Sequence, residues 1–198
     1  MAKDRILPSK TVPAALPRAS RFAAIDFETA DYGRDSACSL AIVVVDGTEI
    51  VARHYYLIRP PRRQIVFSYL HGITWEHVAA KPTFAELWPA MKATFEGVEF
   101  IAAHNASFDR SVLVECCRVG GVALPEYPFH CTVKLARQVW SVFPTKLPDV
   151  CRHLKIPLQH HSAESDASAC ANIVIAARKA GHSLSAPLGR SRKPRIGG

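Results

Sequence analysis

Two carboxylates separated by one residue stand at the end of a short apolar run. Asp26 and Glu28 follow residues 22–25, a run typical of a buried strand. Because side chains alternate along a strand, both carboxylates should point to one face, with Phe27 on the other. Buried carboxylates lose hydration and repel one another unless a cation compensates them. Oxygen ligands suit a hard divalent ion, so the pair predicts a Mg²⁺ or Mn²⁺ site. The alternative is a strand end whose acids simply reach solvent.

Two further acids stand at expected helix starts, where the partial positive charge of the helix favours a carboxylate. Asp109 follows an expected short strand over 98–103, and Asp166 lies near the start of an alanine-rich segment. His161 precedes Asp166 by five residues, and an imidazole with a pKa of about 6.5 is suited to proton transfer. Taken singly, each acid also fits ordinary helix capping, and the histidine also fits a surface position.

The elements that must position these residues predict an α/β domain with a mixed sheet. Strands are expected at the Asp26 segment, over 38–45 and over 49–57, and Asp46-Gly47 is a hairpin signal. These three strands should be antiparallel. Strands alternating with helices follow, and helices are expected over 146–154 and 163–180.

Length and composition limit the class of protein. The 198 residues fit one domain, expected over 21–182, with basic segments at 1–20 and 183–198 that we expect to be disordered. The net charge of +8 suits a polyanionic partner such as nucleic acid, although the charged ends could equally be solvated segments without a role.

Cysteine use and hydropathy point to a compartment. The six cysteines form no C-x-x-C pair, which argues against a zinc site and favours a reducing cytoplasm. No apolar run approaches the roughly 18–20 residues needed to span a bilayer, and prolines interrupt the first 21 residues. We therefore expect neither a membrane partner nor a secretory signal.

The ordered set of motifs resembles a known family. Asp-x-Glu-Thr at 26–29, His-Asn-x-x-Phe-Asp at 104–109 and His-x-x-x-x-Asp at 161–166 are similar to those of the DEDDh branch of DnaQ-like 3′–5′ exonucleases. Bacterial DNA polymerase III epsilon-like domains are the best match. The resemblance implies an RNase H-like mixed sheet, three antiparallel strands then parallel ones, flanked by helices. Family members often have Thr-Gly after the first motif's threonine, whereas this chain has Ala30, which could alter the loop beside the substrate.

The resemblance also implies a two-metal phosphodiesterase using Mg²⁺ or Mn²⁺. Asp26 would bridge the ions, Glu28 and Asp166 would complete the shell of one, and Asp109 would hold the other. His161 would act as general base on the attacking water.

The substrate side is implied in the same way. Thr29 and the backbone around Phe27 would contact the terminal nucleotide, and His104 and Asn105 would lie near its sugar and phosphate. For the last two residues, a strand-to-helix turn fixed by side-chain hydrogen bonds is an equally good and compatible interpretation.

The predicted function is therefore 3′–5′ exonuclease activity on DNA, single-stranded or frayed, releasing nucleoside 5′-monophosphates. Trimming of RNA by an oligoribonuclease-like enzyme is one alternative. A catalytically silent nucleic-acid-binding module is another, although all four acids are retained. A polymerase or repair complex is a possible partner, and the sequence does not indicate an oligomeric state.

Overall fold

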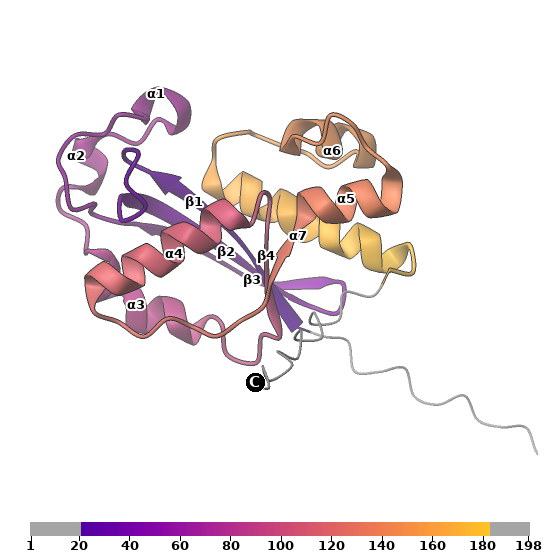
Figure 1. Ribbon diagram of the computed structural model, residues 1–198, viewed down its shortest axis with the longest axis horizontal. Coiled ribbons are helices and arrows are strands. Elements are labelled where there is room, and N and C mark those ends of the chain that lie inside the picture. The colour runs from indigo at the N-terminus through magenta and orange to yellow at the C-terminus, as the bar shows by residue number, and fades with distance from the viewer. Residues whose placement is uncertain (1–20, 183–198) are drawn as a thin grey trace, which may run out of the picture.

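A five-stranded sheet with helices on both faces organises the computed structural model, which describes residues 21–182 (Figure 1). The expected basic segments at 1–20 and 183–198 lie outside the described residues. The strand order is β3-β2-β1-β4-β5. The strands are β1 (Arg21–Thr29), β2 (Ala37–Asp46), β3 (Glu49–Leu57), β4 (Phe100–Ala103) and β5 (Phe129–Cys131).

The first three strands form the predicted antiparallel meander, and β4 and β5 add to β1 in parallel. The β2–β3 turn contains Gly47 at a φ of 59°, a conformation that glycine adopts without strain. The prediction of a mixed sheet with three antiparallel strands and then parallel strands is thus confirmed.

Helices complete the fold on each side of the sheet. They are α1 (Ser68–His71), α2 (Trp75–Val78), α3 (Phe84–Ala93), α4 (Ser107–Gly120), α5 (Thr132–Trp140), α6 (Leu147–Leu154) and α7 (Ala163–Lys179). Two of them, α3 and α4, pack on one face, while α5, α6 and α7 pack on the other (Figure 1). The helices expected over 146–154 and 163–180 correspond to α6 and α7.

Strand β1 is central because both of its faces are apolar. Phe22 and Ala24 pack in the core beneath α7, whereas Ala23 and Ile25 pack in the core beneath α3 and α4. Buried alanines along α7 allow this helix to lie close to the sheet. By the two-residue period of a strand, the next residues on the α7 face are the two acids of the first motif. Asp26 and Glu28 therefore continue the face formed by Phe22 and Ala24 and lie at the carboxyl end of β1.

Five of the six cysteines are buried in the core, and Cys131 is partly buried. All six lie in the described range and none forms a disulfide. Burial raises the pKa of Cys116 to about 12, so its thiol stays protonated. Within residues 21–182, no helix has the length and apolar character needed to cross a membrane.

Candidate active site

Four carboxylates from three elements meet at the carboxyl end of β1. Asp26 and Glu28 come from β1, Asp109 from the first turn of α4 and Asp166 from the first turn of α7. Burial, followed by repulsion from Asp109, Glu28 and Asp166, raises the pKa of Asp26, so all four groups lie within reach of one another's charge. The structure thus brings together the four predicted acids, which are up to 140 positions apart in the sequence.

Asp109 ties α4 to the central strand. Its side chain is buried, and its Oδ1 accepts a hydrogen bond of 3.2 Å from the backbone N–H of Phe27. The Phe27 ring itself lies in the core on the opposite face of β1. Burial raises the pKa of Asp109 to about 7, in spite of that hydrogen bond. The backbone around Phe27 was predicted to contact the terminal nucleotide. In the structure its N–H donates to Asp109, one of the four acids.

Asp166 has one satisfied oxygen and one open oxygen. Its Oδ2 accepts from the backbone N–H of His161 at 3.2 Å and lies 2.9 Å from Nδ1 of His160. Its Oδ1 is buried and has no hydrogen-bond partner among the described residues. A buried carboxylate oxygen without a donor is unfavourable unless a ligand supplies positive charge.

The electrostatics of this cluster favour a cation. Burial, followed by repulsion from Asp166 and Asp109, raises the pKa of Glu28 to about 7. Burial also raises the pKa of Asp26 and of Asp166. The acids together carry more negative charge than their neighbours compensate, and their oxygen atoms are the ligands that Mg²⁺ and Mn²⁺ prefer.

No three His, Cys, Asp or Glu side chains within residues 21–182 already have the arrangement of a metal centre. The fit to divalent cations rests instead on the oxygen donor set, its uncompensated charge and the open Asp166 oxygen. On these three observations the residues fit the metal ions that the sequence predicts.

The two adjacent histidines differ from the sequence-based expectation in their contacts. Only His161 was predicted as a site residue, yet it contacts Asp166 through its backbone, and His160 does so through its ring. The two rings stack with centroids 3.9 Å apart, and both residues line the cavity beside the acids. Because His161 has a φ of 67°, the chain turns sharply there, which the sequence does not reveal. The general-base role of His161 stays a prediction.

A cavity of about 290 Å³ opens beside the acids. Asp26, Glu28 and Asp166 line it together with Thr29, so the predicted substrate residue Thr29 does lie at the site. Phe67, Leu70 and Phe108 contribute the apolar wall of the same cavity. A wall of this kind beside an acidic one suits a ligand with a flat apolar ring and a charged end.

His71 is a cavity residue that the site prediction did not include. Its Nε2 lies 3.2 Å from the carbonyl oxygen of Thr29, and its Nδ1 accepts from the backbone N–H of Ile73 at 3.0 Å. These contacts fasten the α1 segment to the end of β1, and burial lowers the pKa of His71. The His-Gly-Ile-Thr sequence at 71–74 was the available signal.

A second pocket of about 350 Å³ shares Asp26, His160 and Asp166 with the first and adds His104 and Asn105. The predicted residues His104 and Asn105 are therefore also at the site.

His104 is held from both sides of its ring. Nδ1 lies 2.9 Å from the Thr132 hydroxyl, and Nε2 lies 3.1 Å from the Thr145 carbonyl oxygen. Because a carbonyl only accepts, Nε2 carries the proton and Nδ1 accepts from Thr132. Burial lowers the pKa of His104 to about 4, so it is neutral at pH 7.

Asn105 makes the turn that begins α4. It has a φ of 61°, its carbonyl accepts from the Phe108 N–H at 2.8 Å, and its side chain accepts from the Ser107 hydroxyl at 3.2 Å. The turn interpretation of His104 and Asn105 is therefore supported, and it leaves both residues beside the acids.

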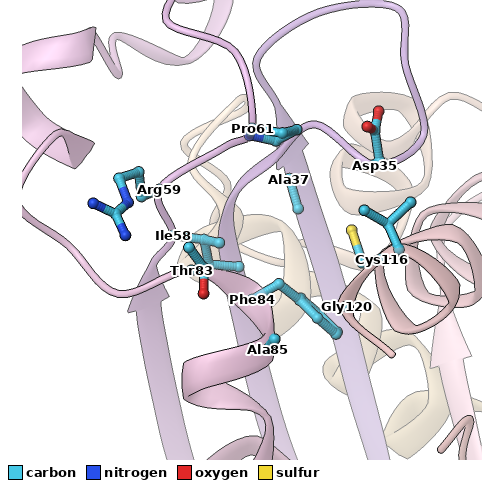
Figure 2. Close-up of a pocket in the computed structure, with 11 residues that line it drawn as sticks. Asp35, Ala37, Ile58, Arg59, Pro61, Thr83, Phe84, Ala85, Cys116 and Gly120 are labelled. Carbon is cyan, nitrogen blue, oxygen red and sulfur yellow. The ribbon is translucent and has the colours of Figure 1, made fainter. Parts of the chain in front are cut away.

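A third pocket of about 330 Å³ lies between α3, α4 and the ends of β2 and β3 (Figure 2). It is lined largely by apolar groups, with Asp35 and Arg59 on opposite sides. It has no lining residue in common with the acidic cavity.

Comparison with known proteins places the chain in a family. The RNase T model, described as Exonuclease, matches residues 23–174. This span contains all four acids and both histidines of the site.

Relatives show the same relationship. Exodeoxyribonuclease 10 of Escherichia coli is 32% identical over 160 residues, which are 76% of this chain and 66% of that protein. The PolC-type DNA polymerase III of Oceanobacillus iheyensis is 32% identical over 170 residues, which are 80% of this chain and 12% of that protein. The chain thus spans slightly less than two thirds of the first relative and a small part of the second.

Solved structures agree with the fold. Exonuclease X in complex with 5′-overhanging duplex DNA superposes with a TM-score of 0.64 at 29% identity, covering 82% of this chain and 94% of that chain. The nuclease domain of 3′hExo, a DEDDh family member bound to rAMP, gives a TM-score of 0.73 at 20% identity, covering 86% and 98%. The predicted RNase H-like exonuclease fold is confirmed, and the chain belongs to the RNase T family of exonucleases, the DEDDh group that its motifs resemble.

Proposed function

We propose that this protein is a metal-dependent 3′–5′ exonuclease that releases nucleoside 5′-monophosphates, with DNA as the favoured substrate. The observation that carries the proposal is the convergence of four carboxylates at the end of β1: Asp26, Glu28 and Asp166 line one cavity together with His160 and His161, and the buried Asp109 lies within reach of their charge. A catalytically silent relative would have little reason to keep an arrangement that costs folding free energy.

The acids would hold the metal ions. Asp26, which interacts electrostatically with the other three acids, would hold the ions together with them. Glu28 and Asp166 would hold one ion and Asp109 the other. When bound, such ions polarise a phosphate and lower the pKa of a bound water.

The histidines would serve the proton transfer. The attacking water gives up a proton to the His161 imidazole as its oxygen bonds to phosphorus. The bond from phosphorus to the 3′-oxygen of the preceding nucleotide then breaks, and that oxygen ends as a 3′-hydroxyl. The terminal nucleotide leaves with its 5′-phosphate. His160, through its contact with Asp166, would hold that carboxylate in position.

The cavity would admit one terminal nucleotide. Its apolar wall of Phe67, Leu70 and Phe108 offers a surface for the base, while Thr29 and the acids would face the sugar and phosphate. A base that enters this cavity must leave its helical stack, which favours single-stranded or frayed ends.

The names of the relatives support DNA over RNA. One is an exodeoxyribonuclease, and the Exonuclease X structure contains duplex DNA with a 5′ overhang. The 3′hExo structure contains rAMP, which keeps RNA trimming as the second candidate. The polymerase relative supports, in the same limited way, a polymerase or repair complex as partner. A reducing cytoplasmic compartment stays a prediction from the cysteines.

The test is hydrolysis of 3′-labelled and 5′-labelled single-stranded DNA and RNA, with Mg²⁺, Mn²⁺ or EDTA. We expect release of the 3′ label as a mononucleotide, a ladder from the 5′-labelled strand, faster reaction on DNA and no reaction in EDTA. Asp26→Asn is the inactive control. Binding without hydrolysis by the wild-type protein would instead support a silent binding module, and faster reaction on RNA would support the second candidate.

A further inference from the structure

The loop between α5 and α6 presents an aromatic side chain to solvent. Phe143 is 71% exposed, and the guanidinium of Arg137 lies over its ring, 5.3 Å from the centroid. Single exposed apolar residues are common, so exposure alone indicates nothing. The ring of Phe143 is unusual in being accompanied by a cation that is itself held in place.

Hydrogen bonds fix that cation to the loop. Arg137 Nε donates to Oγ1 of Thr145 at 2.9 Å, and the same hydroxyl donates to the carbonyl oxygen of Val142 at 2.7 Å. The guanidinium therefore joins α5 to the residues on either side of Phe143. A surface formed in advance by such contacts binds a ligand with a smaller loss of side-chain entropy.

The same loop reaches the candidate active site. The Thr145 carbonyl accepts from Nε2 of His104, and Thr145 and Lys146 line the pocket that contains Asp26 and Asp166. The α5–α6 side of the molecule lies across the carboxyl end of β1 from α1 (Figure 1). A strand whose last nucleotide occupied the cavity under α1 would have this loop as a neighbour on the other side of the acids.

The charge of the loop is positive and unpaired. Among the described residues, neither Arg137 nor Lys146 has a carboxylate within 4.0 Å, whereas Arg59, Arg118 and Arg152 each have one. Lys146 is exposed at the start of α6. Available cations beside an exposed ring are what nonspecific single-strand binding uses: the cations follow the phosphates and the ring stacks on a base.

We infer that Phe143, supported by Arg137 and Lys146, is a stacking platform for a nucleotide upstream of the one being removed. This inference rests on the proposed function and adds to it a binding position outside the acidic cavity. Its ligand is the single-stranded backbone and a base of any identity, because every base offers a flat face.

The test compares long and minimal substrates. Phe143→Ala should raise KM for a DNA strand of about ten nucleotides by about 5- to 100-fold, because base stacking on an aromatic residue contributes that much to affinity. Hydrolysis of the 4-nitrophenyl ester of thymidine 5′-monophosphate, which has no upstream nucleotide, should stay within about twofold of wild type. Phe143→Tyr keeps a ring and should behave as wild type on both.

The matched control is Val119→Ala, another exposed apolar residue, which lines the pocket of Figure 2 and not the acidic cavity. It should change neither rate. In a second measurement, the logarithm of the DNA-binding constant is plotted against the logarithm of the salt concentration. Arg137→Gln should reduce the magnitude of the slope by about 1, which corresponds to the loss of one phosphate contact.

Two outcomes would overturn the platform: unchanged KM for the long strand in Phe143→Ala, or an equal loss of activity on the small ester. The binding assay separates this inference from the proposed function. If the wild-type protein hydrolyses neither substrate, the proposed function fails. Fluorescence anisotropy with labelled single-stranded DNA then decides the platform alone, since weaker binding by Phe143→Ala supports it and equal binding refutes it.

Discussion

Two groups of acids lie within ten positions of each other and have opposite electrostatics. Asp31 and Asp35 lie in the loop after β1, and Arg62, which follows β3, pairs with them at 2.7 Å and 2.5 Å; its hydrogen bonds lower the pKa of both carboxyls. In the cavity, burial and mutual repulsion raise the pKa of Asp26 and Glu28. The loop acids are paired with an arginine, whereas no lysine or arginine of the described residues forms an ion pair with Asp26 or Glu28.

The same difference separates the two kinds of pocket. The apolar pocket of Figure 2 has Asp35 at its edge, but Arg62 compensates that charge. In the acidic cavity, Asp166 retains a buried oxygen that has no hydrogen-bond partner within residues 21–182. A bound ligand can satisfy buried polar groups that lack partners and thereby lower the free energy of the site. The acidic cavity is therefore the candidate for catalysis.

The largest effect that this comparison predicts is on activity. Asp26→Asn or Asp166→Asn should reduce hydrolysis by about 10³-fold or more, because each removes a charged metal ligand worth several kcal/mol in the transition state. Asp35→Asn, a matched change in the compensated group, should reduce it by less than about threefold. Single-turnover rates in Mg²⁺ measure all three.

The metal-free forms provide the matching stability measurement. Without metal, Asp26→Asn should unfold at a higher denaturant concentration than wild type, since one repelling charge is gone, whereas Asp35→Asn should unfold at a lower one. If Asp26→Asn and Asp35→Asn lost equal activity, the difference in electrostatics between the cavity acids and the loop acids would have no role in function.

The next effect concerns the two histidines. His161→Ala should lose about 10²–10⁴-fold in rate if its ring takes the proton from water. His160→Ala should lose only about 10-fold, the usual size for a residue that orients a ligand. Both rates are measured with Mg²⁺ at saturating substrate. The reverse order would assign the general base to His160, whose ring contacts Asp166.

These histidines also show how far the sequence could be interpreted. Apolar runs and alternation predicted the first three strands, the Asp46-Gly47 signal predicted the hairpin, and the alanine-rich segment predicted α7. The acids were predicted because each ends an apolar strand or begins a helix. The backbone at His161 has a positive φ, and no local pattern predicts this turn or which of the two rings contacts Asp166.

The pairing of Arg62 with Asp31 and Asp35 was equally impossible to predict from the sequence. Arg62 is 31 positions from Asp31 and 27 from Asp35, and nothing in their spacing indicates contact. The apolar wall of the cavity was hidden for the same reason, because Phe67 and Leu70 reach it from the segment around α1. Contacts between irregular segments depend on the whole fold, so they required the structure.

A smaller effect should appear in the pH dependence of stability. Glu28 has its pKa raised to about 7, so the folded chain binds this proton more tightly than the unfolded chain does. The contribution of Glu28 to stability should therefore be fully present below pH 4.5, its ordinary pKa, and be lost as the pH rises towards about 7. The shift corresponds to roughly 3 kcal/mol for this group alone.

Denaturant unfolding in EDTA between pH 4.5 and 7 measures this dependence, with Glu28→Gln as the control that should make it less steep; Asp109, whose pKa is also raised to about 7, should keep part of it. Addition of Mn²⁺ at pH 7 should restore stability in the wild type more than in the variant. A wild-type curve that rises with pH across this window would mean that the cavity acids are compensated in solution.

The smallest effect belongs to the compensated acids. Arg62→Ala should lower the free energy of unfolding by about 1 kcal/mol, because two charged hydrogen-bonded pairs are lost at a partly exposed site. Arg152→Ala removes one exposed pair within a helix, that with Asp149, and should cost no more than about 0.5 kcal/mol. Since the pKa values of Asp31 and Asp35 are lowered in the folded chain, their contribution is present at neutral pH and lost as the pH falls through those values. The difference between the two arginine variants should therefore disappear in acid, the opposite direction to the Glu28 effect. A difference that persists at low pH would mean that Arg62 stabilises the loop by packing and not by charge.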